Sequence, residues 1–378
     1  MTQPAAQVQN MRWRDYVLLR GGELDTFWRG HCQQHARKIL FIAGRGFDPR
    51  TTLGLAQIVP LLGTCILDLL ALEFNEGESY PTQPLLDAAA ANWTKLQTHI
   101  TNGSVTSRPI RFRSEDGRRI AARNAANVIS RADEIAGYTD VIVDISAMPR
   151  AVYFPLISRL LYFHDELKNT AQAASNIHVL VSEDPVLDSQ IREHGIDENA
   201  SFLHPFEGDF NREATGVSPR IWIPVLGEGR IIQFDRIFDL VKPEEICPVL
   251  PSPSRNPRRG DDIVMEYRNV LFDQLRIDPR NFIYASELNP FEVYRQIRQA
   301  AWHYHEVLEL IGGCKVAFSP LCSKLMSLGT LLVAYELKTT GLLNVGIAHI
   351  ECQGYEMPQS AHPDVEPVGL WLAGECYG

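Results

Sequence analysis

Residues 38–50 read KILFIAGRGFDPR, a short apolar run that stops at a loop of glycine, arginine, aspartate and proline. A buried strand of a parallel sheet has this form, because helices cover both of its faces and turn residues close it. A helix is predicted to follow over residues 51–62. The stretch therefore predicts the first strand–loop–helix unit of an α/β fold.

The same pattern recurs along the chain. Further strands are predicted over 64–74, 140–145, 177–182, 221–226, 246–250, 281–285, 315–318 and 345–350. Helices are predicted between them over 84–100, 120–136, 151–167, 261–275, 290–311 and 325–337, and a basic hairpin over 104–119. Strands that alternate with helices favour mostly parallel, doubly wound sheets. The predicted fold class is therefore α/β, with two Rossmann-like units.

Two units also suit the length, because 378 residues exceed one ordinary domain. The expected segments are an N-terminal helical segment at 1–37, a first Rossmann-like unit at 38–184, a linker or insertion at 185–220, a second unit at 221–356 and a tail at 357–378. The two units can be laid on one another in element order, with 246–250 opposite 39–43. This pairing raises the hypothesis of an internal duplication, to which a chance match of two α/β halves is the alternative.

Composition narrows the classes of function. A formal net charge of -10 argues against general binding of duplex nucleic acid, which needs a net basic surface, although a local basic groove is compatible with it. Seven scattered cysteines favour neither a disulfide framework nor a zinc site. Residues 1–10 lack the apolar core of a signal peptide, and the apolar stretch 58–72 is shorter than the roughly 20 residues of a membrane helix. We therefore expect a cytoplasmic protein with no membrane partner.

The loop after the first predicted strand is the first candidate ligand site, with Gly44, Arg45, Gly46, Asp48 and Arg50. Ligands of open parallel sheets bind at the carboxyl ends of strands. Glycines let the backbone approach a ligand closely, and arginines bind phosphate oxygens in pairs of hydrogen bonds. The third glycine of a dinucleotide fingerprint is missing, so the loop gives weak support for NAD. The structural alternative is a tight turn whose aspartate caps the next helix and pairs with a neighbouring arginine.

The second candidate loop reads DISAMPR, residues 144–150, and offers Asp144, Ser146 and Arg150. These side chains could orient a ribose and a phosphate, or hold a metal-bound water. Together Asp48 and Asp144 are the candidate catalytic acids, and Mg²⁺ is the candidate cofactor because carboxylates suit Mg²⁺-assisted phosphate chemistry. The structural alternative is a helix cap at Ser146 and a hydrogen-bonded buried acid at Asp144.

The third candidate loop follows the strand at 315–318 and contains Ser319, Ser323 and Lys324. Serine hydroxyls and a lysine at a helix N-terminus make a cradle for an anion, because the helix dipole and its free N–H groups favour negative charge. The loop lacks the glycines of a Walker A motif. Its structural alternative is an ordinary helix cap.

Two resemblances follow from these loops. The loop with Gly44, Gly46, Asp48 and Arg50 resembles the Gly-x-Gly-x-Asp-x-Arg loop of some class I methyltransferases. Those enzymes also have an acidic residue at the end of the second strand, and Glu73 would supply it here. The architecture over residues 38–355 resembles the CRISPR-associated Rossmann fold (CARF) and SAVED sensor domains of prokaryotic immune systems. The second resemblance implies a ligand with several phosphates at the seam of the two units, and separate protein partners.

Three functions are therefore considered. The first is a nucleotide or oligonucleotide sensor, or an accessory protein of an antiviral-defence-like system. The second is a metal-assisted enzyme acting on a nucleotide or a phosphorylated metabolite, with a methyltransferase as a variant. The third is a structural adaptor subunit of a multiprotein complex. The basic, hydroxyl-rich loops favour the sensor.

Overall fold

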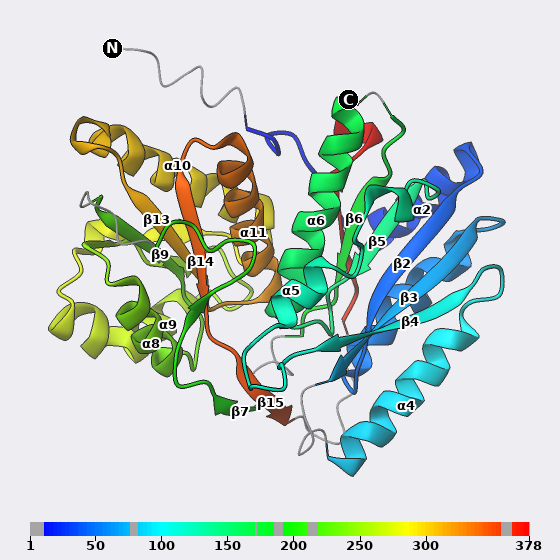
Figure 1. Ribbon diagram of the computed structural model, residues 1–378, viewed down its shortest axis with the longest axis horizontal. Coiled ribbons are helices and arrows are strands. Elements are labelled where there is room, and N and C mark those ends of the chain that lie inside the picture. The colour runs from blue at the N-terminus through cyan, green and yellow to red at the C-terminus, as the bar shows by residue number, and fades with distance from the viewer. Residues whose placement is uncertain are drawn as a thin grey trace. The chain divides into compact units, whose positions relative to one another are not determined.

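The computed structural model describes residues 11–75, 82–170, 172–184, 192–210, 218–356 and 365–377. The chain divides into two compact units (Figure 1). Unit 1 comprises Met1–His194 and Gln353–Gly378, and unit 2 comprises Gly195–Cys352. Each unit is built on a mostly parallel sheet with flanking helices, which confirms the predicted α/β class. No helix among the described residues combines the length and the apolarity needed to cross a membrane.

The sheet of unit 1 has its first long strand in a central position. The strands are β1 (Val17–Arg20), β2 (Lys38–Arg45), β3 (Ile66–Asn75), β4 (Val105–Arg111), β5 (Asp140–Asp144), β6 (Asn176–Val181) and β16 (Val368–Ala373). Their order among the described residues is β1-β16-β6-β5-β2-β3-β4. The five strands from β6 to β4 are parallel, and β16 is antiparallel to both of its neighbours.

Helices cover both faces of this sheet. They are α2 (Gly22–Gln34), α3 (Leu53–Ile58), α4 (Gln83–Thr98), α5 (Ala121–Ala126) and α6 (Arg150–Asn169), with short 3-10 helices η1 (Pro49–Thr52), η2 (Val59–Leu61), η3 (Ala132–Glu134) and η7 (Glu375–Tyr377). Side chains of α2, α3 and α4 share one core with β2 and β3. The interior residues of β2 are all buried, as expected for a parallel strand covered on both faces.

Unit 2 repeats this construction. Its strands are β8 (Ser201–Phe202), β9 (Arg220–Val225), β10 (Glu245–Ile246), β11 (Val249–Pro251), β12 (Ile283–Ala285), β13 (Lys315–Pro320) and β14 (Asn344–His349). Its helices are α8 (Ile231–Val241), α9 (Arg259–Arg268), α10 (Pro290–Leu308) and α11 (Lys324–Thr340), with the short helices η4 (Asn269–Gln274), η5 (Pro279–Asn281) and η6 (Glu309–Ile311). A short ribbon of β7 (Arg192–Ile196) and β15 (Cys352–Glu356) carries the chain between the units.

The five parallel strands follow the same order in both units. That order is β6-β5-β2-β3-β4 in unit 1 and β14-β13-β9-β11-β12 in unit 2. The strand equivalent to β2 is therefore β9, so the predicted match of 39–43 with 246–250 is wrong by one strand. That match rested on similar loop residues, whereas the pairing of strands depends on contacts between distant segments. The internal duplication itself stays a hypothesis.

Several local predictions differ from the structure. Within the segment predicted to be helical, Val17–Arg20 forms β1, which pairs with β16. The predicted helix over 120–136 is reduced to α5, because Asn127 ends it and asparagine favours turns over helix interiors. The predicted hairpin has its turn, but its second run makes a single bridge, from Arg113 to Arg119.

The predicted linker and tail also contain strands. In the linker, β7 pairs with β15, and β8 pairs with the edge of β14. In the tail, β16 is buried along its whole length between β1 and β6, so it completes the sheet of its own unit. Residues 357–364 of the tail lie outside the described residues.

Candidate functional site

Each sheet has a switch point at its carboxyl edge. The first parallel strand is β2 in unit 1 and β9 in unit 2. The chain adds the next two parallel strands on one side of it and then crosses to the other side. The switch point therefore lies between β2 and β5 in unit 1, and between β9 and β13 in unit 2. Ligands of open α/β sheets bind at such points. We call residues 44–50 and 144–150 the unit 1 switch loops, and residues 226–230 and 319–324 the unit 2 switch loops.

Asp48 and Arg50 are bonded to each other in the first unit 1 switch loop. The Arg50 guanidinium donates from Nη2 to Asp48 Oδ2 at 2.7 Å and from Nε to Oδ1 at 3.0 Å. The backbone N–H of Arg50 also donates to Asp48 Oδ1 at 2.9 Å, so the aspartate caps η1. Arg50 is buried. The pair therefore forms the tight turn with a capping aspartate that the sequence allowed as an alternative. The Arg50 guanidinium is not exposed to bind a phosphate.

The glycines of this loop lie against neighbouring strands. A side chain on Gly44 would meet the Phe74 ring at 2.9 Å and the Ala147 carbonyl oxygen of the second switch loop at 3.4 Å. Asn92 of α4 donates from Nδ2 to the carbonyl oxygen of Gly46 at 3.0 Å. Thr51 donates to the carbonyl oxygen of Gly44. The close approach of Gly44 to Ala147 places the two unit 1 switch loops next to each other, and Phe74, Asn92 and Thr51 hold the first loop; sequence reasoning identified none of these three side chains.

The second unit 1 switch loop is anchored by buried polar groups. Asp144 accepts the backbone N–H of Ser146 at Oδ1, at 2.9 Å. Its other oxygen lies against α3, where a side chain on Gly54 would come within 2.4 Å of it. Ser146 is buried and accepts the backbone N–H of Ser182 at 2.8 Å. Ser146 is therefore an internal bridge between the ends of β5 and β6, and its role as a ligand hydroxyl stays a prediction.

Two cations remain near the surface of the unit 1 site. Arg45 is partly exposed, pairs with Glu73 Oε2 at 2.9 Å and lies over the ring of Trp93 at 4.8 Å. Glu73 is therefore beside the glycine loop, within β3, which continues to Asn75, and the methyltransferase resemblance stays a prediction. Arg150 is the first residue of α6 and is partly exposed.

The third predicted loop belongs to unit 2 and follows β13. Ser319 is buried and accepts the indole N–H of Trp222 at 2.9 Å. Strand alternation places Ser319 on the same face as Ala317, inside the core of α8 and α9. The structure therefore places this hydroxyl in the core of unit 2, and its role in anion binding stays a prediction. Ser323 caps α11 through Met326 N at 3.4 Å, and the partly exposed Lys324 is the first residue of that helix.

Sequence reasoning missed the loop after β9. Gly227 is packed against the β13 loop, since a side chain there would come within 2.4 Å of the Leu321 carbonyl oxygen. Glu228 accepts two hydrogen bonds from Arg259, at 2.7 and 2.8 Å. Arg259 also pairs with the buried Glu287, at the end of β12. Burial would raise the pKa of Glu228, but Arg259 holds that pKa below its usual range.

The missed loop has a sequence signal once the strand order is known. Gly44-Arg45-Gly46 stands at the carboxyl end of the central strand of unit 1, which includes Gly44 and Arg45, and Gly227-Glu228-Gly229 comes just after the central strand of unit 2. The helix after the fourth parallel strand begins with a basic residue in both units, Arg150 and Lys324. The first and second predicted loops thus lie next to each other in unit 1. The third predicted loop lies next to the loop after β9 in unit 2. A ligand at the seam of the units stays a prediction.

The residues best placed to hold a metal lie elsewhere in unit 1. His31, Asp140 and His178 are buried, and their ligand atoms lie within 4.8 Å of one another. However, Asp140 Oδ1 also accepts a hydrogen bond from Asn176, and Oδ2 faces the Arg37 guanidinium at 3.5 Å. The cluster lies at the amino ends of β5 and β6, opposite the switch point. We interpret it as a hydrogen-bonded core, because a cation would compete with Arg37.

Burial and hydrogen bonding shift two pKa values in this cluster. Burial would raise the pKa of Asp140, but hydrogen bonds from His178 and His31 hold it far below its usual range. Burial lowers the pKa of His178, and the neighbouring carboxylate offsets this only in part. The stable state of the cluster is therefore an ionised Asp140 with a neutral His178, which donates its Nε2–H.

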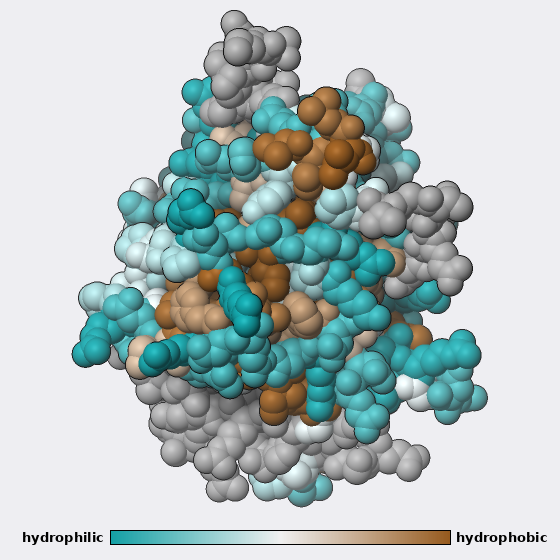
Figure 2. All heavy atoms as spheres, turned by 90° about the vertical axis from the view of Figure 1, so that its left-hand side faces the viewer, coloured by the Kyte–Doolittle hydropathy of each residue, from teal (hydrophilic) through white to brown (hydrophobic). Residues whose placement is uncertain are grey.

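Unit 2 also exposes apolar side chains. Figure 2 shows a largely hydrophilic face interrupted by apolar patches. At the end of α10 and in η6, Val307, Leu310 and Ile311 are 58%, 97% and 63% exposed. Contiguous exposed apolar residues are typical of contact surfaces.

Comparisons with known proteins do not assign a family. No protein-family model and no curated protein sequence matches the chain. Among solved structures, a universal stress protein from Archaeoglobus fulgidus DSM 4304 aligns at 8% identity and a TM-score of 0.23, over 82% of this chain and 95% of that one. The glycosyltransferase SsfS6 of Streptomyces sp. SF2575 aligns at 10% identity and a TM-score of 0.17, over 81% and 92% of the two chains. Its complex with thymidine diphosphate aligns at 12% identity and a TM-score of 0.16, over 82% and 87%. Similarity at this level carries no argument about function.

Proposed function

We propose that the chain is a nucleotide- or oligonucleotide-binding sensor, or an accessory protein, of the kind found in prokaryotic immune systems. The observation that carries the proposal is the repeated switch point. In both units a Gly-x-Gly sequence stands at the carboxyl end of the central strand, and the neighbouring parallel strand leads into a helix that begins with a basic residue. The resemblance to CARF and SAVED domains, which was drawn from the sequence, points to the same class of ligand.

The chemistry of these loops suits a phosphate group. Glycines at a strand end bring backbone N–H groups close to a ligand, and the N-terminus of the facing helix favours negative charge. Arg45, Arg150 and Lys324 are the cations that would contact the phosphates. Arg50, Ser146 and Ser319 would act indirectly, because they hold the loops and the core through buried hydrogen bonds.

The proposal is tested by a thermal-shift screen of the full chain. The panel contains mononucleotides, linear and cyclic oligonucleotides and S-adenosylmethionine, each with and without Mg²⁺. A ligand at about a hundred times its dissociation constant adds about 2.7 kcal/mol of apparent stability. We expect a ligand to raise the melting temperature. For a ligand bound by unit 1 this shift is lost in the double variant Arg45→Ala/Arg150→Ala, and for one bound by unit 2 it is lost in Lys324→Ala. Chromatography of the ligand afterwards separates a sensor, which leaves it intact, from an enzyme.

Arg280→Ala is the matched control. Arg280 is exposed in unit 2 and forms a surface ion pair with Asp278 at 2.6 Å, so its removal changes the net charge without touching a switch loop. Equal loss of the shift in this control and in Lys324→Ala would refute a localised site. The absence of any shift across the panel would refute the sensor itself.

The two alternatives gain unequal support. A metal-assisted enzyme using Asp48 is disfavoured, because both of its carboxylate oxygens accept hydrogen bonds from Arg50. The exposed end of α10 favours an adaptor as the second candidate function. An adaptor would show no thermal shift with any ligand of the panel. It would copurify with a partner protein, and Leu310→Ser would abolish that copurification.

A further inference from the structure

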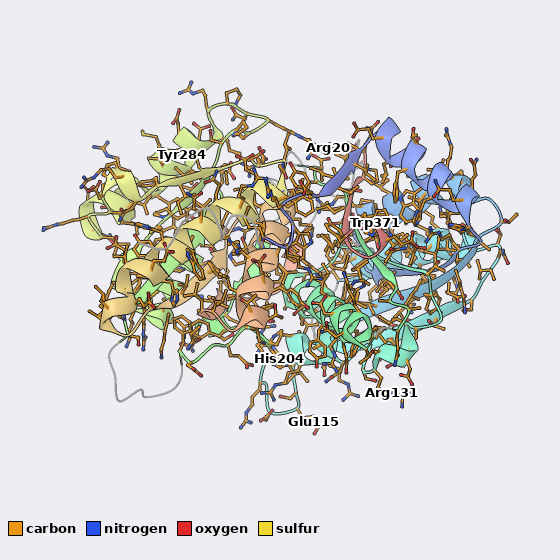
Figure 3. All side chains as sticks on the ribbon, turned by 90° about the horizontal axis from the view of Figure 1, so that it is seen from above. Arg20, Glu115, Arg131, His204, Tyr284 and Trp371 are labelled. Carbon is orange, nitrogen blue, oxygen red and sulfur yellow. The ribbon has the colours of Figure 1, made fainter. Side chains whose placement is uncertain are left out.

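A basic segment in unit 1 takes no part in the switch loops. Residues 104–123 contain six arginines and two acidic residues, within a chain whose formal net charge is -10. The segment comprises β4, a turn around Gly117 and the start of α5. Figure 3 labels Glu115, which lies at a loop tip where side chains project outward from unit 1. This concentration of positive charge therefore stands out on an otherwise acidic chain.

The base of this segment is fixed to the sheet. Phe112 is buried, and its ring contacts the Phe74 ring edge-on, with centroids 6.1 Å apart. Arg113 and Arg119 form an antiparallel bridge beyond it. Arg111 is in register with Asn75 at the carboxyl end of β3. The segment thus lies two strands from β2, which is roughly 10 Å across the sheet, and is separate from the switch point.

A pocket of about 310 Å³ opens beside the segment, between β4 and α5. Its apolar floor includes Ile110 and Val128, both buried. Asn124 and Asn127 line it from α5 and the turn after α5. The pocket is open to solvent and combines an apolar lining with a few polar groups.

The two arginines of the pocket have different roles. Arg108 is held in place, because it donates to the carbonyl oxygen of Val128 and pairs with Glu134 at 3.0 Å. Burial would raise the pKa of Glu134, but hydrogen bonds from Ser130 and Arg108 lower it to about 2. Arg111 is exposed at the pocket rim, and its backbone carbonyl oxygen accepts a hydrogen bond from Asn124 Nδ2 at 2.8 Å. Arg111 is therefore positioned by its backbone, while its guanidinium faces solvent.

We propose that the pocket and the basic segment bind a single-stranded nucleic acid. The exposed arginines contact its phosphates, and the pocket takes one unpaired base against Ile110 and Val128. The asparagine amides can both donate to and accept from the edge of that base. A duplex would hide the base edge that the pocket reads. This site goes beyond the proposed function, because it uses residues outside the switch loops and reads an unpaired base of a single strand.

Edge protection is the competing explanation of the same residues. β4 is the last strand of its sheet among the described residues, and charged residues with a proline are common on edge strands, where they prevent further strand pairing. This explanation predicts that removing Arg111 promotes aggregation and leaves any binding of nucleic acid unchanged. Nucleic-acid binding predicts the reverse.

The test is fluorescence anisotropy of the full chain with labelled single strands of about 12 nucleotides, as RNA and as DNA, in about 50 to 200 mM NaCl. We expect Arg111→Ala to weaken binding about tenfold and to reduce the salt slope by about 0.7, the value for one phosphate contact on a single strand. Asn127→Ala should weaken binding about five- to tenfold with an unchanged slope, because its amide carries no charge.

Arg131→Ala is the matched control in the same unit. Arg131 is exposed outside the pocket, pairs with Asp133 at 3.0 Å and is labelled in Figure 3. An equal loss of affinity in this control would overturn the proposal, and so would equal or tighter binding of a duplex. Competition by polyglutamate as effective as by unlabelled oligonucleotide would indicate an acidic protein partner instead. Failure of wild-type single-strand binding at low salt would refute this site alone, since the proposed function is judged on mononucleotides and cyclic oligonucleotides as well, and on variants of the switch loops.

Discussion

Asp140 is the residue whose replacement tests the packing of unit 1 most directly. It is fully buried, and its Oδ1 accepts hydrogen bonds from His31 Nε2 at 2.8 Å, His178 Nε2 at 3.0 Å and Asn176 Nδ2 at 3.0 Å. Oδ2 accepts from the Thr139 hydroxyl at 2.7 Å. The carboxylate thus links α2 to two strands of the sheet.

Asp140→Asn keeps the shape of the side chain and removes its charge. An asparagine amide places a donor against the donors already present, and Arg37 loses one of its two carboxylate partners. Removing one member of a buried charged group costs about 3–5 kcal/mol. For a cooperative unit of this size, about 2–4 °C of melting temperature is lost per kcal/mol, so we expect a decrease of roughly 6–20 °C.

The assay is urea and thermal denaturation followed by circular dichroism. Asp165→Asn is the matched control, because Asp165 forms a partly exposed pair with Arg12 at 2.6 Å and its loss should cost less than about 1 kcal/mol. A cost below about 1 kcal/mol for Asp140→Asn as well would refute the reasoning, since it would mean that the buried hydrogen bonds contribute nothing beyond those of a surface pair.

The same cluster gives a pH dependence with a definite sign. The folded-state pKa values of His178 and Asp140 are both lowered, so each group stabilises the fold above its unfolded pKa. The histidine contribution is complete above about pH 6.5 and is lost as the pH falls below it, and the carboxylate contribution follows below about pH 4. Stability that stays constant or rises between about pH 7.5 and 5.5 would contradict this, and His178→Asn should show a smaller decrease.

Three further predictions concern the loops. Arg50→Ala should destabilise the chain by about 1.5–3 kcal/mol in urea denaturation, because Asp48 loses charged hydrogen bonds, and an unchanged midpoint would argue against the buried pair. Gly227→Ala should cost about 1–3 kcal/mol, because the added carbon overlaps the facing backbone, and a neutral effect would show that the loops can separate freely. Ser319→Ala should cost about 1–3 kcal/mol by leaving the Trp222 indole N–H without its acceptor, while nucleotide binding in the thermal-shift screen persists.

The candidate site was only partly predictable, and Arg50 shows why. Its position after Gly-x-Gly suits a phosphate ligand, and the same position also suits an ion pair with Asp48. Local sequence allows both, and the choice depends on how far α3 and α4 bury the loop. Arg45 lies five positions before Arg50 and remains near the surface. The spacing of the two arginines does not show which of them is buried.

The sequence by itself determined the α/β class and the place of the first glycine loop. Apolar runs such as 38–43 must be buried, and the glycines, aspartate and proline after them end the strand, so these features follow from local chemistry. Only the tertiary structure decided which strands are neighbours: β9 takes the central position in unit 2, β16 enters the sheet from the far end of the chain, and Gly227 meets the β13 loop. Such pairings join segments distant along the chain, and they depend on side-chain fit across the sheet, which no single stretch of sequence contains.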